Sequence, residues 1–337
     1  MSLPTYVKQR RTPRPEDFLA RELNVSIPEA NRILQVYKKW EEEDFVGYYI
    51  NPTKRHVRPF WLLPKAAEEQ SLVLAPAGTP GDELKLVQFE VDTQGHMELA
   101  YTMFQATSPE FLIEILDGGN NLKKLQNEYV HARTIAGNAR RPFIWPETYL
   151  LNVQNAPRTL MVNFKNLSPL ENAIRWCFHG RRWYHKEAPA NVQTAIEKRF
   201  GRMEKTYTYF LTLSRESMSA PENINFPALT LAPGQLLQEG QAPFFWATDE
   251  ADTEIHKLCA VSTGPFEFQL RERQSGRTLS NGWVQVTNGW GDGEYPFIFA
   301  ETFLIERNYQ VLFEVRDLSG AQNIIYPTMI GRRLQYA

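Results

Sequence analysis

The feature that most constrains the fold of this 337-residue chain is an internal repeat. The segment 142–151, with the sequence PFIWPETYLL, matches the segment 296–305, PFIFAETFLI. A second segment, 160–168 (LMVNFKNLS), matches 311–319 (VLFEVRDLS). Repeats of about 100 residues have the usual size of one domain. The chain is therefore expected to contain two copies of one module.

The last part of each copy aligns without a gap. Gly180 lies twelve positions after Ser168, and Gly331 lies twelve positions after Ser319. Such ungapped agreement is hard to obtain by chance, so we expect both copies to adopt the same fold. The repeat signature consists of Glu147, Asn172, Gly180, Arg181 and Arg182 in the first copy and Glu301, Asn323, Gly331, Arg332 and Arg333 in the second.

The repeat divides the chain into five expected parts. They are a basic arm with a helical hairpin at 1–65, a linker at 66–83, the first copy at 84–186, a helix and linker at 187–243, and the second copy at 244–337. The hairpin and linkers are inferred from helical apolar spacing and from proline-rich composition.

Hydrophobic residues within the copies follow a period of two. Phe266, Phe268 and Leu270, for example, alternate with polar residues. Short alternating runs separated by Gly, Asn, Asp and Pro are typical of antiparallel sandwiches, and the 12% aromatic content also favours sheet. The predicted fold class is mainly β: two tandem duplicated antiparallel β-sandwich (jelly-roll-like) modules behind a short helical N-terminal region.

The N-terminal region carries more apolar side chains than a short hairpin can bury against itself. Large exposed apolar patches mark interfaces. We therefore predict that residues 1–65 attach the protein to partners, and that their deletion leaves a folded monomer that no longer joins its assembly. The predicted interface residues are Phe18, Leu19, Leu23, Ile33, Leu34, Tyr37, Trp40, Phe60 and Trp61.

The same region permits a helix-turn-helix interpretation. Residues 18–34 have the required spacing, and the basic arm before them would suit contact with phosphates. Against this, the reading helix would begin Ile27-Pro28-Glu29, which offers few donors to base edges, and four acids follow it at 41–44. A helical hairpin that docks on a protein is favoured, and DNA binding is kept as a third hypothesis.

No catalytic, cofactor or metal constellation can be assembled from the sequence. None of the six histidines lies in a metal-binding motif, and Cys177 and His179 together supply only two ligands. The Gly-Arg-Arg motif could hold phosphates or carboxylates. The favoured interpretation is structural: glycine starts a turn, and one arginine pairs with an acid of its own copy, Glu147 or Glu301. We expect no enzyme, no cofactor and no metal.

Charge and hydropathy limit the compartments. The net charge of −2 argues against a surface devoted to nucleic acid, although the basic arm leaves a local contact open. We expect no signal peptide and no membrane span, because no apolar run approaches ~18 residues. The two cysteines form no disulfide framework. Synthesis and retention in cytoplasm are expected.

The chain is expected to have a basic arm, a helical segment and repeated β-sandwich modules, and no catalytic site. This plan resembles that of structural proteins of tailed bacteriophage virions, such as capsid, decoration and neck or collar proteins. The pattern from Glu301 to Gly331-Arg-Arg333 carries most of this similarity. The resemblance implies a virion component made in the host cytoplasm, with other virion proteins and copies of itself as partners.

The alternative hypothesis is a carbohydrate-binding β-sandwich protein. In that case exposed aromatic side chains would serve as stacking platforms for sugar rings. The candidates are Trp246, Trp283 and Trp290.

Overall fold

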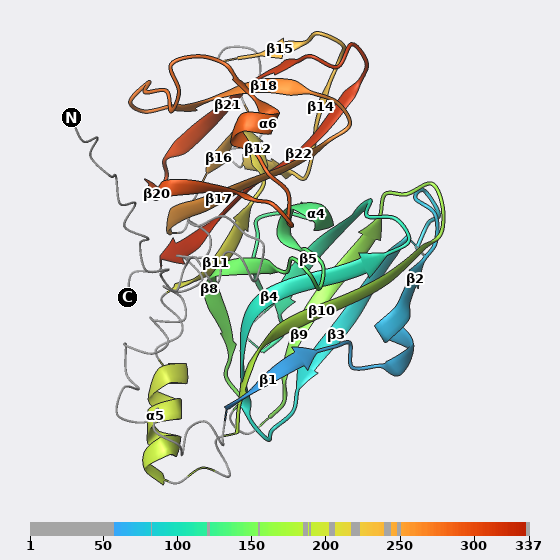
Figure 1. The fold of residues 1–337 in the computed structure, drawn as a ribbon, viewed down its shortest axis with the longest axis vertical. Helices are drawn as coiled ribbons and strands as arrows, with labels where there is room; N and C mark the ends of the chain where they lie inside the picture. The colour runs from blue at the N-terminus through green and yellow to red at the C-terminus, as the bar shows by residue number, and fades with distance from the viewer. Residues whose placement is uncertain are drawn as a thin grey trace, which may run out of the picture.

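The computed structural model describes residues 57–334, except positions 82 and 189 and the segments 120–121, 154–155, 185–187, 202–205, 217–222, 239–243 and 248–250. The described chain forms two antiparallel sandwiches, each made of two sheets (Figure 1). This confirms the predicted fold class, which is mainly β with jelly-roll-like modules. The predicted helical hairpin lies outside the described residues.

The first sandwich consists of sheets A and B. Sheet A has the strand order β1-β10-β4-β8, with β2 also paired to β10. Its strands are β1 (Val57–Leu62), β2 (Leu72–Leu74), β4 (His96–Ala106), β8 (Phe143–Leu151) and β10 (Asn172–Trp183). Sheet B has the order β3-β9-β5-β6, with β7 paired to β5. Its strands are β3 (Leu84–Val91), β5 (Phe111–Asp117), β6 (Lys123–Lys124), β7 (Val130–His131) and β9 (Arg158–Asn166).

The second sandwich consists of sheets C and D. Sheet C has the order β11-β22-β17-β20, with β14 paired to β22. Its strands are β11 (Thr206–Leu211), β14 (Leu229–Leu231), β17 (Asp252–Ser262), β20 (Phe297–Ile305) and β22 (Asn323–Leu334). Sheet D has the order β13-β12-β16-β21-β18-β19, with β15 paired to β21. Its strands are β12 (Leu213–Glu216), β13 (Asn223–Phe226), β15 (Leu236–Leu237), β16 (Phe244–Ala247), β18 (Phe266–Glu272), β19 (Val284–Gln285) and β21 (Gln310–Asp317).

Helices are short and lie between strands. They are the 3-10 helix η1 (Ala67–Ser71) and the α-helices α4 (Ala132–Ile135), α5 (Ala190–Gly201) and α6 (Val286–Gly289). The helices α4 and α6 follow β7 and β19 directly, so they occupy equivalent places in the two copies. Helix α5 lies beside the first sandwich (Figure 1), where Phe200 stacks on His96 with ring centroids 4.4 Å apart.

Strand register makes the equivalence of the copies explicit. In sheet A, Gly180 of β10 lies opposite Phe60 of β1; in sheet C, Gly331 of β22 lies opposite Tyr209 of β11. Both long pairs also shift register at one place, next to Gly180 in β10–β4 and opposite Gly331 in β17–β22. Strand β1 therefore corresponds to β11, β4 to β17, β8 to β20 and β10 to β22.

Strand pairing extends each copy further toward the N-terminus than the expected starts at 84 and 244. Strands β1 and β2 fall in the expected arm and linker, yet both pair with β10. Strands β11 to β15 fall in the expected linker at 187–243 and pair into sheets C and D. These strands are two to six residues long, too short to show a clear alternation in the sequence.

Aromatic side chains fill both cores. Trp176 of β10 contacts Phe111 and Phe164 of sheet B, and Phe313 of β21 contacts Trp246 and Trp290. The predicted alternation is confirmed, since Phe266, Phe268 and Leu270 all point into the core. Burial of one such side chain contributes on the order of 2 kcal/mol to folding. The buried side chains of the two copies are continuous with each other through Phe143, Trp145 and Phe210.

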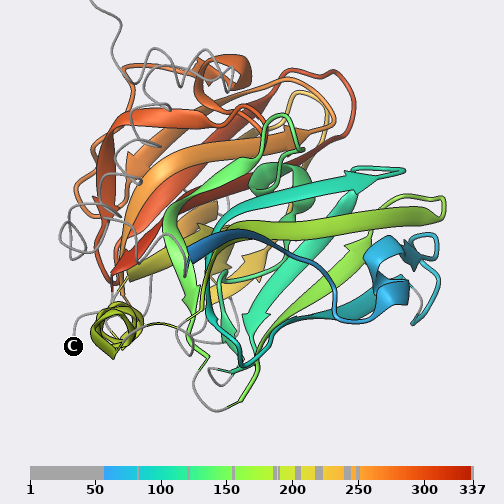
Figure 2. The same cartoon turned by 60° about the horizontal axis from the view of Figure 1, so that its bottom comes forward.

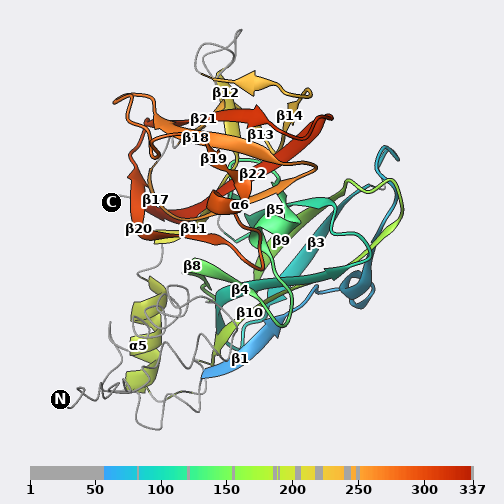
Figure 3. The same cartoon turned by 45° about the horizontal axis from the view of Figure 1, so that its top comes forward.

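The two sandwiches meet where β8 of the first lies beside β11 of the second, as Figures 1, 2 and 3 agree. Strand β8 also contacts β22, and α4 contacts β17. The corresponding edge strands, β1 and β20, form the other edges of sheets A and C, and the turn that leads into β20 contacts α4 (Figure 1). No helix in the described part of the chain is long and apolar enough to cross a membrane.

Candidate assembly surface

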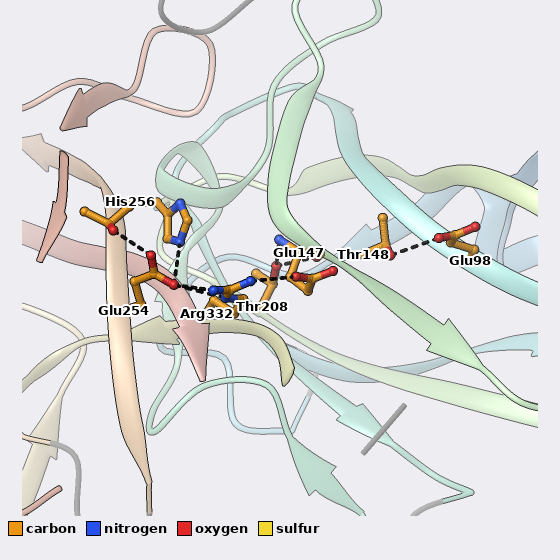
Figure 4. Close-up of polar contacts among 8 residues, drawn as sticks. Glu98, Glu147, Thr148, Thr208, Glu254, His256 and Arg332 are labelled. Atoms are coloured by element: carbon orange, nitrogen blue, oxygen red, sulfur yellow. Dashed lines mark hydrogen bonds and ion pairs between the residues drawn. The ribbon is translucent and has the colours of Figure 1, made fainter. Parts of the chain in front are cut away.

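The junction between the two sandwiches begins with a polar clasp between β8 and β11. The backbone N–H of Glu147 donates to Thr208 Oγ1 at 3.0 Å, and Thr208 Oγ1 donates back to the Glu147 carbonyl at 2.5 Å (Figure 4). Because these bonds join two edge strands, neither strand leaves its whole edge open to other chains. The clasp fixes how the copies lie against each other.

An ion-pair network crosses the same junction. Arg332 Nη2 donates to Glu254 Oε2 at 2.6 Å within the second copy, and Arg332 Nη1 reaches Glu147 Oε2 of the first copy at 3.4 Å (Figure 4). Burial raises the pKa of the Glu254 carboxyl, but the hydrogen bond from Thr302 and the Arg332 charge outweigh burial, so this pKa lies below its usual value. Glu254 therefore stays ionised at neutral pH.

Aromatic contacts and two further hydrogen bonds also join the copies at the junction. Phe210 of β11 is fully buried and packs against Phe143 and Trp145 of β8, with centroids 6.4 and 5.8 Å apart. The Phe210 N–H donates to the carbonyl of Leu125 at 2.9 Å. Lys257 of β17 donates to the Ile144 carbonyl at 2.8 Å. The first copy thus presents β8 and the segment around Leu125 to the second copy.

Helix α4 of the first copy fits into a socket on the second. Thr134 Oγ1 lies 3.0 Å from Thr328 Oγ1 of β22, and the Gly293 N–H donates to the Arg133 carbonyl at 2.5 Å. Asn138, just after α4, donates to Glu294 Oε1 at 2.7 Å. A side chain at Gly293 would collide with the α4 backbone, so glycine is required at this close approach.

The arginine motif departs from its sequence-based interpretation in two respects. Gly180 and Gly331 lie inside β10 and β22 rather than at turns. Glycine is needed at both positions because a Cβ would collide with the facing carbonyl of Glu98 or Glu254. Arg332 takes Glu254, not Glu301, as its acid within the copy, and its second acid is Glu147 of the other copy. The expected pairing with Glu301 is therefore wrong for Arg332.

The second arginine of each motif points inward instead. The Arg182 guanidinium pairs with Asp92 and lies 4.8 Å from the centre of the Phe60 ring. The Arg333 guanidinium lies 4.5 Å from the centre of the Tyr209 ring. Cation–π contacts of this kind hold β1 and β11 against their sheets in the same way. Arg182 and Arg333 therefore serve the fold, as the structural interpretation predicts.

The signature asparagines brace a turn in each copy. Asn172 is buried, and its amide donates to the Ser108 carbonyl at 2.9 Å. Asn323 is also buried and donates to Gly264 O at 3.1 Å. Buried amides cost free energy unless their hydrogen bonds are satisfied, so these bonds fix the start of β10 and β22.

A cavity of about 940 Å³ opens on sheet A of the first copy. Trp61, Met103 and Cys177 line it from neighbouring strands, on the face that points away from sheet B. Arg140 and Arg175 lie at its exposed sides, and no acid lines it among the described residues. Of the predicted interface residues, Trp61 is 58% exposed, whereas Phe60 is half-buried under Arg182.

The predicted pair of candidate ligands, Cys177 and His179, lies on β10. Cys177 and His179 share one face of β10, as the spacing predicts, but His179 contacts Trp61 and Tyr101 rather than further ligands. Burial lowers the pKa of His179 and raises the pKa of Cys177. Within the described residues, no three His, Cys, Asp or Glu side chains form a group that could hold a metal ion.

The tryptophans expected as sugar platforms are not exposed rings. Trp246 and Trp290 are buried in the core, with centroids 5.9 Å apart. Trp283 is half-buried, and the Arg316 guanidinium lies 4.8 Å from its ring centre. The remaining predicted interface residues, from Phe18 to Trp40, lie outside the described residues and stay predictions.

Comparisons with known proteins place these observations beside other folds. No protein-family model and no curated protein sequence matches the chain. Among solved structures, the major capsid protein P2 of bacteriophage PM2 aligns over 83% of this chain and 98% of its own, with 9% identity and a TM-score of 0.36. PNGF-II aligns over 88% and 68%, with 8% identity and a TM-score of 0.32.

An archaeal virus protein with a triple jelly roll aligns over 82% of this chain and 59% of its own, with 9% identity and a TM-score of 0.18. These similar structures therefore include viral capsid and turret proteins beside a protein of another kind. Every one of these TM-scores is below 0.5, and the comparisons do not place the chain in a family.

Proposed function

We propose that the chain is a non-enzymatic structural component of a bacteriophage virion, of the capsid, decoration or neck type, and that it works by assembling with copies of itself and with other virion proteins. The protein is made in the host cytoplasm and becomes part of the particle. The main attachment to other virion proteins is the predicted region 1–65, reduced to residues 1–56 because β1, from Val57, pairs with β10.

One observation carries this proposal: apolar side chains stay exposed along the outer edges of sheets A and C. Trp61 and Leu63 of the β1 edge are 58% and 45% exposed. Leu304 of β20 is 48% exposed. Apolar surface of this kind at a strand edge is typical of an interface.

The buried tryptophans and the convergence of polar groups on the junction support assembly over the two alternatives. A sugar-binding protein needs exposed stacking rings, and two of its three candidates are core residues. DNA binding rests on residues 15–40 and the basic arm before them. The clasp, the network and the socket all serve contacts between β-sandwiches.

The proposal is tested by sedimentation of the purified full-length chain and by mass spectrometry of purified particles. We expect oligomers at micromolar concentration and the intact chain in the particle. A chain that stays monomeric at high concentration and is missing from particles would contradict the proposal. A glycan array provides the comparison for the sugar-binding alternative, with no binding expected.

A further inference from the structure

The junction inside the chain provides a template for a contact between chains. Phe210 of β11 is fully buried there, while Trp61, at the equivalent position of β1, is 58% exposed. Both residues lie one position after the residue opposite the bulge glycine, so their places in the two sheets are the same. The β1 edge therefore corresponds to the β11 edge, which β8 covers inside the chain, but no strand among the described residues covers β1 in the same way.

The opposite edge of the molecule is incomplete in the complementary way. Phe143 and Trp145 are 1% exposed under Phe210, whereas their equivalents on β20, Phe297 and Phe299, are half-buried. Leu125 is fully buried at the junction, whereas its equivalent, Leu279, is 43% exposed. The β20 edge corresponds to the β8 edge of the junction, and no strand among the described residues pairs with its outer side.

The 940 Å³ cavity corresponds to the socket that α4 fills inside the chain. Cys177 of β10 lies opposite Met103 of β4, and at the equivalent positions Thr328 of β22 lies opposite Cys259 of β17. In the second copy, Thr328 is covered by Thr134 of α4 at 3.0 Å. The helix equivalent to α4 is α6, whose Thr287 and Asn288 are exposed. Among the described residues, no helix therefore fills the cavity at the β1 edge, and α6 at the β20 edge fills no cavity.

Charges on the two edges are complementary. Glu301 is exposed on β20 at the place from which Glu147 reaches Arg332, and Arg181 is the equivalent of Arg332. Asn138 donates to Glu294 across the junction; the equivalent pair between two chains is Asp292 with Arg140, an acid with an exposed base. Complementary charges fix the register of an interface more than they strengthen it.

From these equivalences we infer that the β20 and α6 edge of one copy packs on the β1 edge and cavity of a second copy, and so repeats between chains the junction found within the chain. This inference rests on the proposed self-assembly and names its partner surface. The contact is head-to-tail: each copy is related to the next by the same rotation that relates the two sandwiches within a chain. A closed ring forms when repetition of this rotation adds up to a full turn. Asn288 then lies against Cys177 of the next copy.

A disulfide cross-link tests this contact directly. A tagged full-length chain with Asn288→Cys and Cys177→Ser is mixed with the untagged wild-type chain and oxidised mildly. We expect one covalent dimer with one chain of each kind, because the introduced thiol faces Cys177 at the place where Thr134 faces Thr328. The matched control replaces the wild-type partner with Cys177→Ser, which leaves only the buried Cys259 and should give no dimer.

A second variant tests the energetics without a covalent bond. Trp61→Glu places a charge in the proposed contact and should weaken self-association at least about 30-fold, as for a central aromatic anchor. Leu170→Glu, at an exposed turn residue that neither belongs to β1 or β20 nor lines the cavity, should leave it unchanged. Thermal melting checks that both variants fold.

The outcomes separate the inference from the proposed function. If the chain is oligomeric and present in particles but forms no cross-link, and if Trp61→Glu associates normally, the inferred contact is wrong while the proposed function stands. If the wild-type chain is monomeric and missing from particles, the proposed function itself fails.

Discussion

Gly331 shows at the scale of one residue why the arginine motif begins with glycine. Its β22 backbone passes so close to β17 that an added Cβ would meet the Glu254 carbonyl and lie 3.2 Å from the Ile255 Cα. The φ angle at this position is ordinary, so the requirement is space rather than backbone freedom. Glu254 is also the acid that holds Arg332. The glycine therefore keeps the β17 backbone in the position that the network needs.

We expect Gly331→Ala to lower the free energy of unfolding by about 1–3 kcal/mol, because overpacking must move β17 or β22. The urea midpoint, measured by circular dichroism, checks this. Gly282→Ala is the matched control, since nothing lies within 4 Å of a Cβ there and its midpoint should stay unchanged. Equal midpoints for the two variants would contradict the argument.

The sequence predicts the signature residues but not their partners. Matching positions reveal that Glu147 and Glu301, or Arg181 and Arg332, share a place in the fold. They cannot reveal that Arg332 takes one acid from each copy, because that depends on how two folded modules lie together. The missed residues, Thr208 and Glu254, carry no motif, and only their strand register places them at the junction.

At the scale of elements, the turn between β21 and β22 uses a charged brace where the first copy uses a neutral one. Asp317 accepts from the Gly234 N–H at 2.9 Å, Ser319 Oγ at 2.7 Å and Asn323 Nδ2 at 3.0 Å. Burial raises the pKa of Asp317, but these three donors outweigh it, and the pKa lies below its usual value. Asn166 occupies the equivalent position opposite Phe111.

The sign of the pH effect follows from the lowered pKa. Asp317 contributes stability above its unfolded pKa of about 3.9, and that contribution is lost as the pH falls through the folded value. The wild type should lose free energy of unfolding as the pH falls from 5 to 2. We expect Asp317→Asn to lose less over this range, by on the order of 1 kcal/mol. Urea unfolding at several pH values measures it, with the exposed Glu171→Gln as control. An identical acid profile for wild type and Asp317→Asn would count against the brace.

Long strands were predictable from the sequence, whereas short edge strands were not. The alternation at Phe266 to Leu270 is long enough to reveal β18 and its buried face. Strands such as β2 and β14 have three residues each, and their identity is set by pairing with β10 and β22. Tertiary pairing therefore decides these elements, and local pattern does not.

At the scale of the whole molecule, the sheet pairing revises where the N-terminal attachment region ends. Strand β1 starts at Val57 and pairs with β10 along its whole length, so it belongs to the first sandwich. Removal of residues 1–65 would take β1 away and uncover β10. A clean test of attachment must therefore keep β1.

We expect a chain without residues 1–56 to keep both sandwiches folded and to lose incorporation into particles. Circular dichroism and melting report the fold, and mass spectrometry of particles reports incorporation. Its control is the chain without residues 1–65, which should melt at a lower temperature because β10 loses its edge partner. Normal incorporation of the 1–56 deletion would show that attachment lies elsewhere.

The covalent link between the two sandwiches has a kinetic consequence. Modules on one chain meet at an effective concentration in the millimolar range or above, whatever the dilution of the protein. The junction built on Glu147 and Phe210 therefore forms as the chain folds, without an encounter between molecules. Separate modules would need a collision for every contact around a ring. Fused modules need only half as many, so the fusion halves the number of bimolecular steps in assembly.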